Sequence, residues 1–537
     1  MATQQGAPSV PFLPDAIANE LRLRLSPSAR VRVDDAARLL YSRDCWPWLL
    51  IHTRAGRHSL RPPHAVVQPA TIEDVQETIR MAAAHGLPVV PYGAGSGVTG
   101  AAVPTRGGLT VDLKRLTSLD LSLAGDGIAR LGAGWVGGRL EHVLNRRGLT
   151  LGHFPSSIGC STLGGWIATR SAGQLSTRHG KIEDRVLATR LVDANGDLRH
   201  VPTPHTDALP ILVGSEGTLG VLVDADVVIE PLPRARRYRG FLARTVDEAL
   251  DAMREVLQQG QRPAVLRLYD AFDTFISSAR RATAGAAPSS DGLTRRLRAW
   301  IDRRVSVSEA RRFALNAGAG LLRRTDMAPI ALNRAADTLF DGCLLIAGVE
   351  EADDEHADAS AADLFGLLGD RLDDLGTAPG DHWYAHRYDV SYKQSPAYDS
   401  GIFVDTMEVA ASWDRLPHLH AAVRSALGDH VFVMAHFSHA YAAGCSIYFT
   451  FAGFGRDDDE CLTIYARAWN AALAAAARSG GAVTHHHGVG LLKAAHLIDD
   501  HTGGGALFDR VKHAVDPDDR LNPGKLWHAP PFDEVRP

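Results

Sequence analysis

The chain has 537 residues, 45% of them hydrophobic and 22% charged, a balance that argues against a disordered, collagen-like or coiled-coil protein. Its 57 basic and 62 acidic residues give a formal net charge of −5, so the overall positive field that would hold nucleic acid is absent. The length exceeds that of one ordinary domain, and we expect several.

Cysteine usage and the N-terminus both indicate a cytoplasmic protein. The cysteines are scattered and include no C-x-x-C pair, which predicts neither a disulfide framework nor a cysteine zinc site. The first residues lack the basic and apolar regions of a secretory signal. The longest apolar runs fall short of the ~18 residues that a membrane-spanning helix needs.

The order of hydrophobic patterns predicts several regions. Residues 1–60 are predicted to be helical, with a tryptophan-rich patch at 45–48 that packs against the body of the protein. Residues 61–234 alternate between strands and helices, and Thr71 is a predicted N-cap. The Asn195-Gly196 pair predicts a hairpin turn.

Residues 235–480 are predicted to form a second domain, and residues 481–537 to return to the first. Segments 266–271, 343–348 and 403–410 are its predicted strands, in an antiparallel sheet covered by helices on one side.

Residues 295–324 contain nine arginines, against only Asp302 and Glu309, whereas residues 350–374 are rich in acidic residues. The simpler interpretation is two solvated segments of opposite charge. The alternative is a peripheral contact of the basic segment with a membrane or a partner.

A glycine-rich loop runs from Pro91 to Gly100 and contains G-x-G-x-x-G at Gly95, Gly97 and Gly100. A Rossmann loop opens a helix directly, whereas this loop leads to a further predicted strand at 107–113. We therefore expect an inter-strand loop whose main-chain N–H groups converge on an anion such as a pyrophosphate. A plain structural turn is the alternative.

Two further segments combine small residues with exposed main chain. Residues 156–162 carry hydroxyls at a predicted helix start, and residues 214–221 precede a predicted strand. Three such segments exceed what turns alone require, and they indicate one long cofactor.

The order PYGAGSG, STLGGWIATRSAG, RHGKIEDRV, VGSEGTLGV and DPDDRLNPGKL resembles the vanillyl-alcohol-oxidase family of FAD proteins over residues 61–528. The segments GGWIATRSAG, KIED, GCSIYFTF and HHHGVG are similar to its alkyldihydroxyacetonephosphate (alkylglycerone-phosphate) synthase-like clade. The resemblance implies an α+β fold. A PCMH-type FAD-binding domain of two subdomains would carry a cap domain over the flavin ring.

By this resemblance three sets of residues contact FAD. They are Pro91, Tyr92, Gly93, Ala94, Gly95, Ser96 and Gly97 around the pyrophosphate; Ser156, Ser157, Ile158, Gly159, Cys160, Ser161, Thr162, Thr169, Arg170, Ser171 and Ala172; and Glu216, Gly217, Thr218, Leu219, Gly220, Val221 and Leu222. No histidine or cysteine lies in the loop where some relatives attach the flavin, so we expect non-covalent FAD, with a link from the cap domain as the alternative. Cys160 is expected to be a buried small residue, and a flavin anchor is the alternative.

Tyr448 lies in a predicted strand, on the face opposite Ile447 and Phe449. The resemblance implies that it faces the flavin and exchanges a proton with the substrate, and a core tyrosine is the alternative. A phenol with an ordinary pKa of about 10 is a poor base at neutral pH unless a neighbour takes its proton.

Three consecutive histidines, His485, His486 and His487, supply such neighbours. An extended backbone would send His485 and His487 to one face and His486 to the other. The alternatives are a structural role and a metal site formed by His436, His439 and His486, although we expect no metal.

Arg267 is a candidate partner for an anion, with a structural ion pair as the alternative. Synthases carry a substrate-contacting arginine upstream of a segment that resembles residues 408–415. An ungapped count from that segment gives Gln394, beside Lys393. Lys393 could supply the charge as a point cation, but the departure weakens the assignment of a synthase substrate.

Three functions remain open. The favoured one is an FAD-dependent oxidoreductase, in which a hydroxyl-bearing acid or alcohol loses a proton to Tyr448 or a histidine and a hydride to flavin N5. The alternative is a non-redox synthase, in which a fatty alcohol displaces the acyl group of acyl-glycerone phosphate to give an ether lipid. The third is a non-catalytic flavoprotein. We expect a small-molecule substrate, an unidentified electron acceptor, no nucleic-acid partner and a homodimer.

Overall fold

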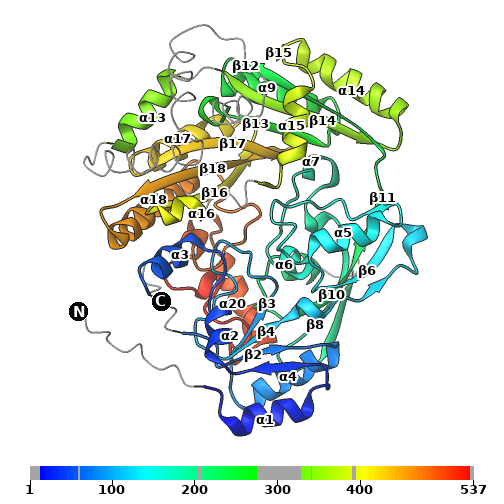
Figure 1. The fold of residues 1–537 in the computed structure, drawn as a ribbon, viewed down its shortest axis with the longest axis vertical. Coiled ribbons are helices and arrows are strands. Elements are labelled where there is room, and N and C mark those ends of the chain that lie inside the picture. The colour runs from blue at the N-terminus through cyan, green and yellow to red at the C-terminus, as the bar shows by residue number, and fades with distance from the viewer. Residues whose placement is uncertain are drawn as a thin grey trace, which may run out of the picture.

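The computed structural model describes residues 12–57, 61–202, 208–274, 328–339, 342–389 and 395–532. Two smaller sheets occupy the lower part of the molecule and one large sheet the upper part (Figure 1). This mixture of helices and sheets confirms the predicted α+β class. The basic segment at 295–324, with its proposed membrane contact, lies outside the described residues. None of the helices in the described ranges is long and apolar enough to cross a bilayer.

The first sheet has the strand order β1-β2-β4-β3. Strands β2 (Ala65–Gln68), β4 (Leu109–Asp112) and β3 (Val89–Tyr92) are parallel and largely buried, as valine-rich strands covered on both faces should be. Helix α4 (Ile72–Ala84) joins β2 to β3 and begins at the predicted N-cap, where the Thr71 hydroxyl accepts the N–H of Asp74.

The N-terminal region supplies helices α1 (Asp15–Arg24), α2 (Asp35–Leu40) and α3 (Pro47–Arg54). The prediction that this region is helical throughout is wrong, because β1 (Arg30–Arg32) pairs with the edge of β2. Val31 packs on the core there, between two outward-facing arginines. The tryptophan-rich patch packs inward as expected, with Trp46 and Trp48 buried.

The second sheet is antiparallel, in the order β5-β6-β10-β8-β9. Its hairpin turns at Asn195-Gly196, as predicted, with Gly196 in the left-handed region. Helices α5 (Gly137–Asn145) and α6 (Leu163–Ala168) pack on this sheet. Its strands are β5 (Leu119–Asp120), β6 (Ile128–Gly132), β8 (Val186–Val192), β9 (Leu198–Pro202) and β10 (Val221–Val228). Two short strands, β7 (Leu149–Thr150) and β11 (Glu230–Pro231), pair with each other.

The large sheet is antiparallel in the order β15-β12-β14-β13-β17-β18-β16. The three segments predicted as strands all lie in it. Its strands are β12 (Ala235–Ala243), β13 (Val265–Tyr269), β14 (Cys343–Glu351), β15 (Asp373–Asp374), β16 (Ile402–Ser412), β17 (Phe432–Ala440) and β18 (Gly444–Phe454).

Helices cover both faces of this sheet, which corrects the prediction of one covered side. Four helices share a core with Leu345 and Ala347 of β14: α9 (Val246–Gln258), α14 (Asp354–Gly369), α17 (Leu416–Gly428) and α18 (Asp458–Arg478). Helix α15 (Ala378–His386) packs on the other face, where the alternating Leu344 and Ile346 point. Successive side chains of β14 point to opposite faces of the sheet, so the strand contributes to the core on both sides.

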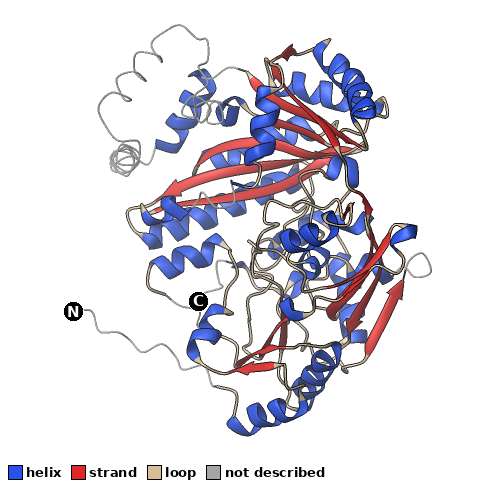
Figure 2. Cartoon of the chain, turned by 45° about the vertical axis from the view of Figure 1, so that its right-hand side comes forward, coloured by secondary structure: helices blue, strands red, loops and turns tan. Residues whose placement is uncertain are grey.

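The last segment of the chain returns to the first sheet. After α19 (Leu497–Asp500) and α20 (Gly504–Val515), Leu521 bridges to Val89 of β3, and the N–H of Asn522 donates to the Val89 carbonyl at 2.7 Å. The red C-terminal segment accordingly lies beside the blue N-terminal sheet in Figure 1. Figure 2 shows that loops gather between the large sheet and the two smaller ones. The predicted site residues lie on several of these loops.

Candidate active site

The three glycine-rich segments meet in space. The loop after β3 contacts the start of α6, because a Cβ on Gly93 would overlap the Thr162 hydroxyl. It also contacts the segment before β10, where a Cβ on Gly217 would lie 2.8 Å from Pro91 Cγ. A hydroxyl residue of residues 156–162 begins a helix, as predicted, because Thr162 is the N-cap of α6. Three segments far apart in sequence therefore form one continuous cradle.

The loop after β3 fits a bound pyrophosphate. Within the described part of the chain, no residue accepts a hydrogen bond from the main-chain N–H groups of residues 94–99. Gly95 has a φ of +67°, and a Cβ there would overlap the Tyr92 hydroxyl. Unused N–H donors and the lack of side chains are what a phosphate-binding loop requires.

Several predicted cofactor residues use their side chains within the protein. The Arg170 guanidinium donates to the carbonyls of Val213 at 2.9 Å and Pro210 at 2.6 Å. The Glu216 carboxylate accepts the N–H groups of Val489 at 2.5 Å and Gly490 at 3.0 Å. The prediction for Cys160 is wrong: its side chain is exposed, because it lies in the turn before Thr162 instead of in the core.

Tyr448 lies on the face of β18 opposite Ile447 and Phe449, as predicted, and those two residues are fully buried. Its hydroxyl is hydrogen-bonded to Nε2 of His487, and its ring stacks on His436 at 4.8 Å. Burial raises the pKa of Tyr448 above its ordinary value, and the nearby Glu408 carboxylate raises it further. The phenol is therefore neutral at pH 7 and needs His487 to take its proton.

The histidine loop, residues 484–490, is bent, which corrects the extended backbone expected for the three histidines. Glu408 Oε1 accepts the N–H groups of His485, His486 and His487 at 3.2, 3.3 and 3.1 Å. Three successive N–H groups cannot reach one oxygen in an extended strand, whose N–H groups alternate in direction. His485 and His486 consequently contact each other, with their Nδ1 atoms 2.9 Å apart, and His487 alone contacts the Tyr448 hydroxyl.

Glu408 and Lys493 form a charge pair that the sequence analysis missed. Both side chains are fully buried, and Lys493 Nζ lies 2.5 Å from Glu408 Oε2. Burial alone would raise the pKa of Glu408, but Lys493 and His487 hold that pKa well below its usual range. The available signal was a glutamate in the apolar strand VDTMEVA and a lysine in the apolar run LLKAA.

Ser176 joins two bodies of the molecule at this site: the smaller body, residues 61–234, and the larger body, residues 235–480 with the large sheet. Its helix, α7 (Ser176–His179), belongs to the smaller body, and its hydroxyl lies 2.7 Å from Nδ1 of His439 on β17. Tyr441 donates a hydrogen bond to the same hydroxyl at 3.3 Å. His439 has a φ of +57°, a conformation that only surrounding contacts can hold. Burial lowers the pKa of His439 and of His486 well below the ordinary value, so both rings are neutral.

Arg267 carries a positive charge that no acid of the described residues matches. It lies on β13 with an NH2 group 2.7 Å from Nε2 of His436, and its buried Nε has no hydrogen-bond partner within the part of the chain that the structure describes. No carboxylate of the described ranges lies within ion-pair distance, which argues against the alternative of a structural ion pair. Lys393 and the adjacent Gln394 lie outside the described residues. The described residues include no group of three or more metal-binding side chains arranged to hold an ion.

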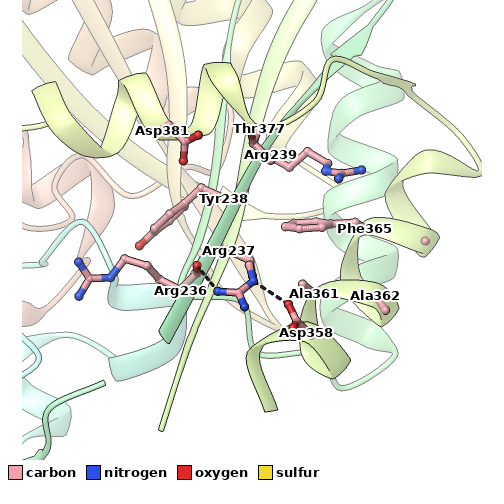
Figure 3. Close-up of a pocket in the computed structure, with 11 residues that line it drawn as sticks. Arg236, Arg237, Tyr238, Arg239, Asp358, Ala361, Ala362, Phe365, Thr377 and Asp381 are labelled. Atoms are coloured by element: carbon pink, nitrogen blue, oxygen red, sulfur yellow. Dashed lines mark hydrogen bonds and ion pairs between the residues drawn. The ribbon is translucent and has the colours of Figure 1, made fainter. Parts of the chain in front are cut away.

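A cavity of about 530 Å³ lies elsewhere, between β12, α14 and α15 (Figure 3). Three arginines of β12 line it, and each is matched by an acid: Arg236 pairs with Glu350, Arg237 with Asp354 and Asp358, and Arg239 with Asp374. None of its lining residues belongs to the glycine-rich segments or the histidine loop. The candidate active site is therefore the meeting point of the cradle and the histidine loop.

Comparison with known proteins defines the class. A profile described as an FAD binding domain matches residues 63–202, and one described as the C-terminal domain of FAD linked oxidases matches residues 232–526. The chain belongs to the FAD-linked oxidase family, has the PCMH-type FAD-binding fold, and is an enzyme that uses FAD.

Within this family the chain is similar to alkyldihydroxyacetonephosphate synthases. The synthase of Trypanosoma brucei brucei is 30% identical over 98% of this chain and 83% of its own length. The synthase of Dictyostelium discoideum is 28% identical over 89% of this chain and 75% of its own. A solved alkyldihydroxyacetonephosphate synthase structure, 25% identical, superimposes with a TM-score of 0.74 over 97% of this chain and 87% of its own.

Proposed function

We propose that this protein is an alkyldihydroxyacetonephosphate synthase-type transferase. It would replace the acyl group of an acyl-glycerone phosphate with a fatty alcohol and form an ether lipid without net oxidation. The observation that carries the proposal is the extent of similarity. The synthase of Trypanosoma brucei brucei matches 98% of the chain, whereas the glycolate oxidase subunit of Bacillus subtilis matches 44% and the D-lactate dehydrogenase of Arabidopsis thaliana 39%. The non-redox alternative thus has better support than the oxidation favoured by the sequence.

The chain's own groups suit this reaction. Arg267 offers an unmatched guanidinium on the sheet face of Tyr448 and His436, where it can bind a phosphate group. Tyr448 passes its proton to Nε2 of His487, and the resulting phenolate removes a proton from the substrate carbon. Bound FAD supplies a ring that accepts electron density from the substrate and returns it.

An assay with palmitoyl-glycerone phosphate and labelled hexadecanol, without an electron acceptor, tests the proposal. We expect an ether product together with released palmitate and no lasting loss of flavin absorbance. Absence of ether, with lasting anaerobic bleaching by a hydroxy acid, would instead establish the oxidoreductase.

The oxidoreductase remains the second candidate because of one relative. An uncharacterised FAD-linked oxidoreductase of Escherichia coli K12 is 25% identical over 88% of this chain and 90% of its own length. In both reactions Tyr448 can take a proton from the substrate after it has passed its own to His487.

A further inference from the structure

The two oxygens of Glu408 have different partners. Oε1 accepts the three N–H groups of His485, His486 and His487, and the Thr484 hydroxyl at 3.1 Å. Oε2 lies 2.5 Å from Lys493 Nζ and 3.1 Å from His487 Nδ1. The contact with His487 is an ion-pair approach and does not count as an aligned hydrogen bond among the described residues.

Glu408 also lies directly beside the proton donor. Strands β16 and β18 pair so that Glu408 is opposite Tyr448. His487 contacts both side chains. Its Nε2 contacts the Tyr448 hydroxyl, which can donate a hydrogen, and its Nδ1 contacts the Glu408 carboxylate, which can only accept one. The order Tyr448, His487, Glu408, Lys493 is a continuous chain of polar contacts.

The Glu408 carboxylate determines which ring nitrogen of His487 carries the hydrogen. An ionised carboxylate can only accept, so the favourable ring has its hydrogen on Nδ1, toward Glu408. Nε2 then presents a lone pair to the Tyr448 hydroxyl and can take its proton. The opposite tautomer would direct an N–H at the phenol and leave it without a base. An acid that orients a histidine in this way is a recurring arrangement in enzymes.

The positive charge of Lys493 stabilises the ionised form of Glu408 at a position that solvent does not reach. Neither side chain is exposed to solvent. Removing one partner of a buried pair leaves an uncompensated charge, whereas removing both leaves a neutral core. Glu408 and Lys493 can therefore be replaced together without leaving a buried unpaired charge.

We propose that Glu408, held by Lys493, is a positioning residue that fixes the Nδ1–H tautomer of His487 and so makes Nε2 the base for Tyr448. The inference rests on the proposed roles of Tyr448 and His487, and it applies equally to the synthase and to the oxidoreductase reaction.

The test uses the FAD-loaded Glu408→Gln variant and the charge-neutral double variant Glu408→Gln/Lys493→Met. Both retain an acceptor for the histidine loop, and the double variant leaves no buried unpaired ammonium. We expect kcat to fall ~10²–10⁴-fold, with FAD content and KM little changed, as when an orienting acid is lost. The matched control is Asp405→Asn, an equally buried acid of β16 whose partners are Tyr465 and Trp469; it should retain activity.

A second measurement needs no substrate. Nitrogen-15 NMR of ring-labelled histidine, with the His487→Gln spectrum subtracted, reports which nitrogen of His487 is protonated. We expect Nδ1–H in the unmodified protein and Nε2–H in the double variant. A wild-type ring protonated at Nε2, or an unchanged tautomer in a variant that has lost activity, would overturn the inference. If the NMR result holds while no ether forms, the proposed function fails and the inference stands.

Discussion

Glu216 and Glu408 bind neighbouring N–H groups of the same loop. Glu408 takes those of His485 to His487, and Glu216 takes those of Val489 and Gly490. Glu408 comes from the large sheet, whereas Glu216 comes from the third glycine-rich segment of the smaller body. Two buried carboxylates from different bodies thus fix the backbone of an irregular loop.

Glu216 should be needed to hold this loop. Its φ of +52° is costly for a residue with a side chain, which points to a function for that conformation. Glu216→Ala would leave two buried N–H groups without an acceptor, at about 1–3 kcal/mol each in the free energy of unfolding. Glu216→Gln keeps an acceptor and should lose less. Denaturant unfolding gives the energies, and hydrogen exchange over residues 484–490 should rise in the alanine variant alone. Unchanged exchange in that variant would contradict the assignment.

Tyr448→Phe removes the hydroxyl that contacts His487 and leaves the ring stacked on His436. We expect ether formation to fall ~10²–10⁴-fold, the range that a general acid–base group contributes. FAD content and melting temperature should stay close to wild type. A Tyr441→Phe variant is the comparison, since Tyr441 contacts Ser176 at the same site but not His487. Equal losses in the two variants would show that Tyr448 has no special role.

Arg267→Met tests the anion site. Loss of an unmatched guanidinium should raise the KM for a phosphate-bearing substrate on the order of 10–100-fold, because charged hydrogen bonds contribute about 1.5–3 kcal/mol. The effect should vanish for a substrate analogue that lacks the phosphate. Arg237→Met is the matched control, since that arginine lines the separate cavity and is already paired. A KM that rises equally for both substrates would exclude phosphate binding by Arg267.

Local sequence signals predicted the secondary structure around the site well. Thr71 was identified as an N-cap and residues 156–162 as a helix start carrying hydroxyls, and the loop at 91–100 was placed between strands because the next segment is β-like. The face of Tyr448 followed from alternation alone. These features depend on residues close together in the chain.

The features that the sequence did not predict depend on contacts between residues far apart in the chain. The bend of the histidine loop is imposed by Glu408, and the pair of Glu408 with Lys493 joins residues 85 positions apart. A single glutamate in a strand and a single lysine in an apolar run do not indicate that the two residues form a pair. The helices on both faces of the large sheet were missed for a related reason, because burial of both faces removes the polar alternation that marks a solvent face.

Gly95→Ala tests the fit of the cradle to FAD. Gly95 has a left-handed φ, and a methyl group there would displace the Tyr92 ring. Gly56→Ala is the matched control: its φ of +74° carries a similar backbone cost, of about 1 kcal/mol, but no atom of the described residues lies within 4 Å of the added carbon. After extensive dialysis the ratio of flavin to protein absorbance should fall only in Gly95→Ala. Retention of FAD by both variants would remove this loop from the cofactor site.

Stability should fall as the pH rises from about 4 to 7, in part because of Asp405. Burial raises the pKa of Asp405 to about 7, although Tyr465, Thr406 and Trp469 donate hydrogen bonds to it. Between its unfolded pKa of about 4 and its folded pKa, the folded protein binds more protons than the unfolded chain, so raising the pH favours unfolding. Asp405→Asn should flatten this slope by up to a few kcal/mol across the window. Asp270, whose pKa burial also raises to about 7, directly follows β13 and lies away from β16, and Asp270→Asn should remove a separate, additive share. Urea unfolding at pH 5 and pH 7 for the single and double variants measures both shares, and a slope that neither variant changes would mean that both carboxyls remain ionised in the folded protein.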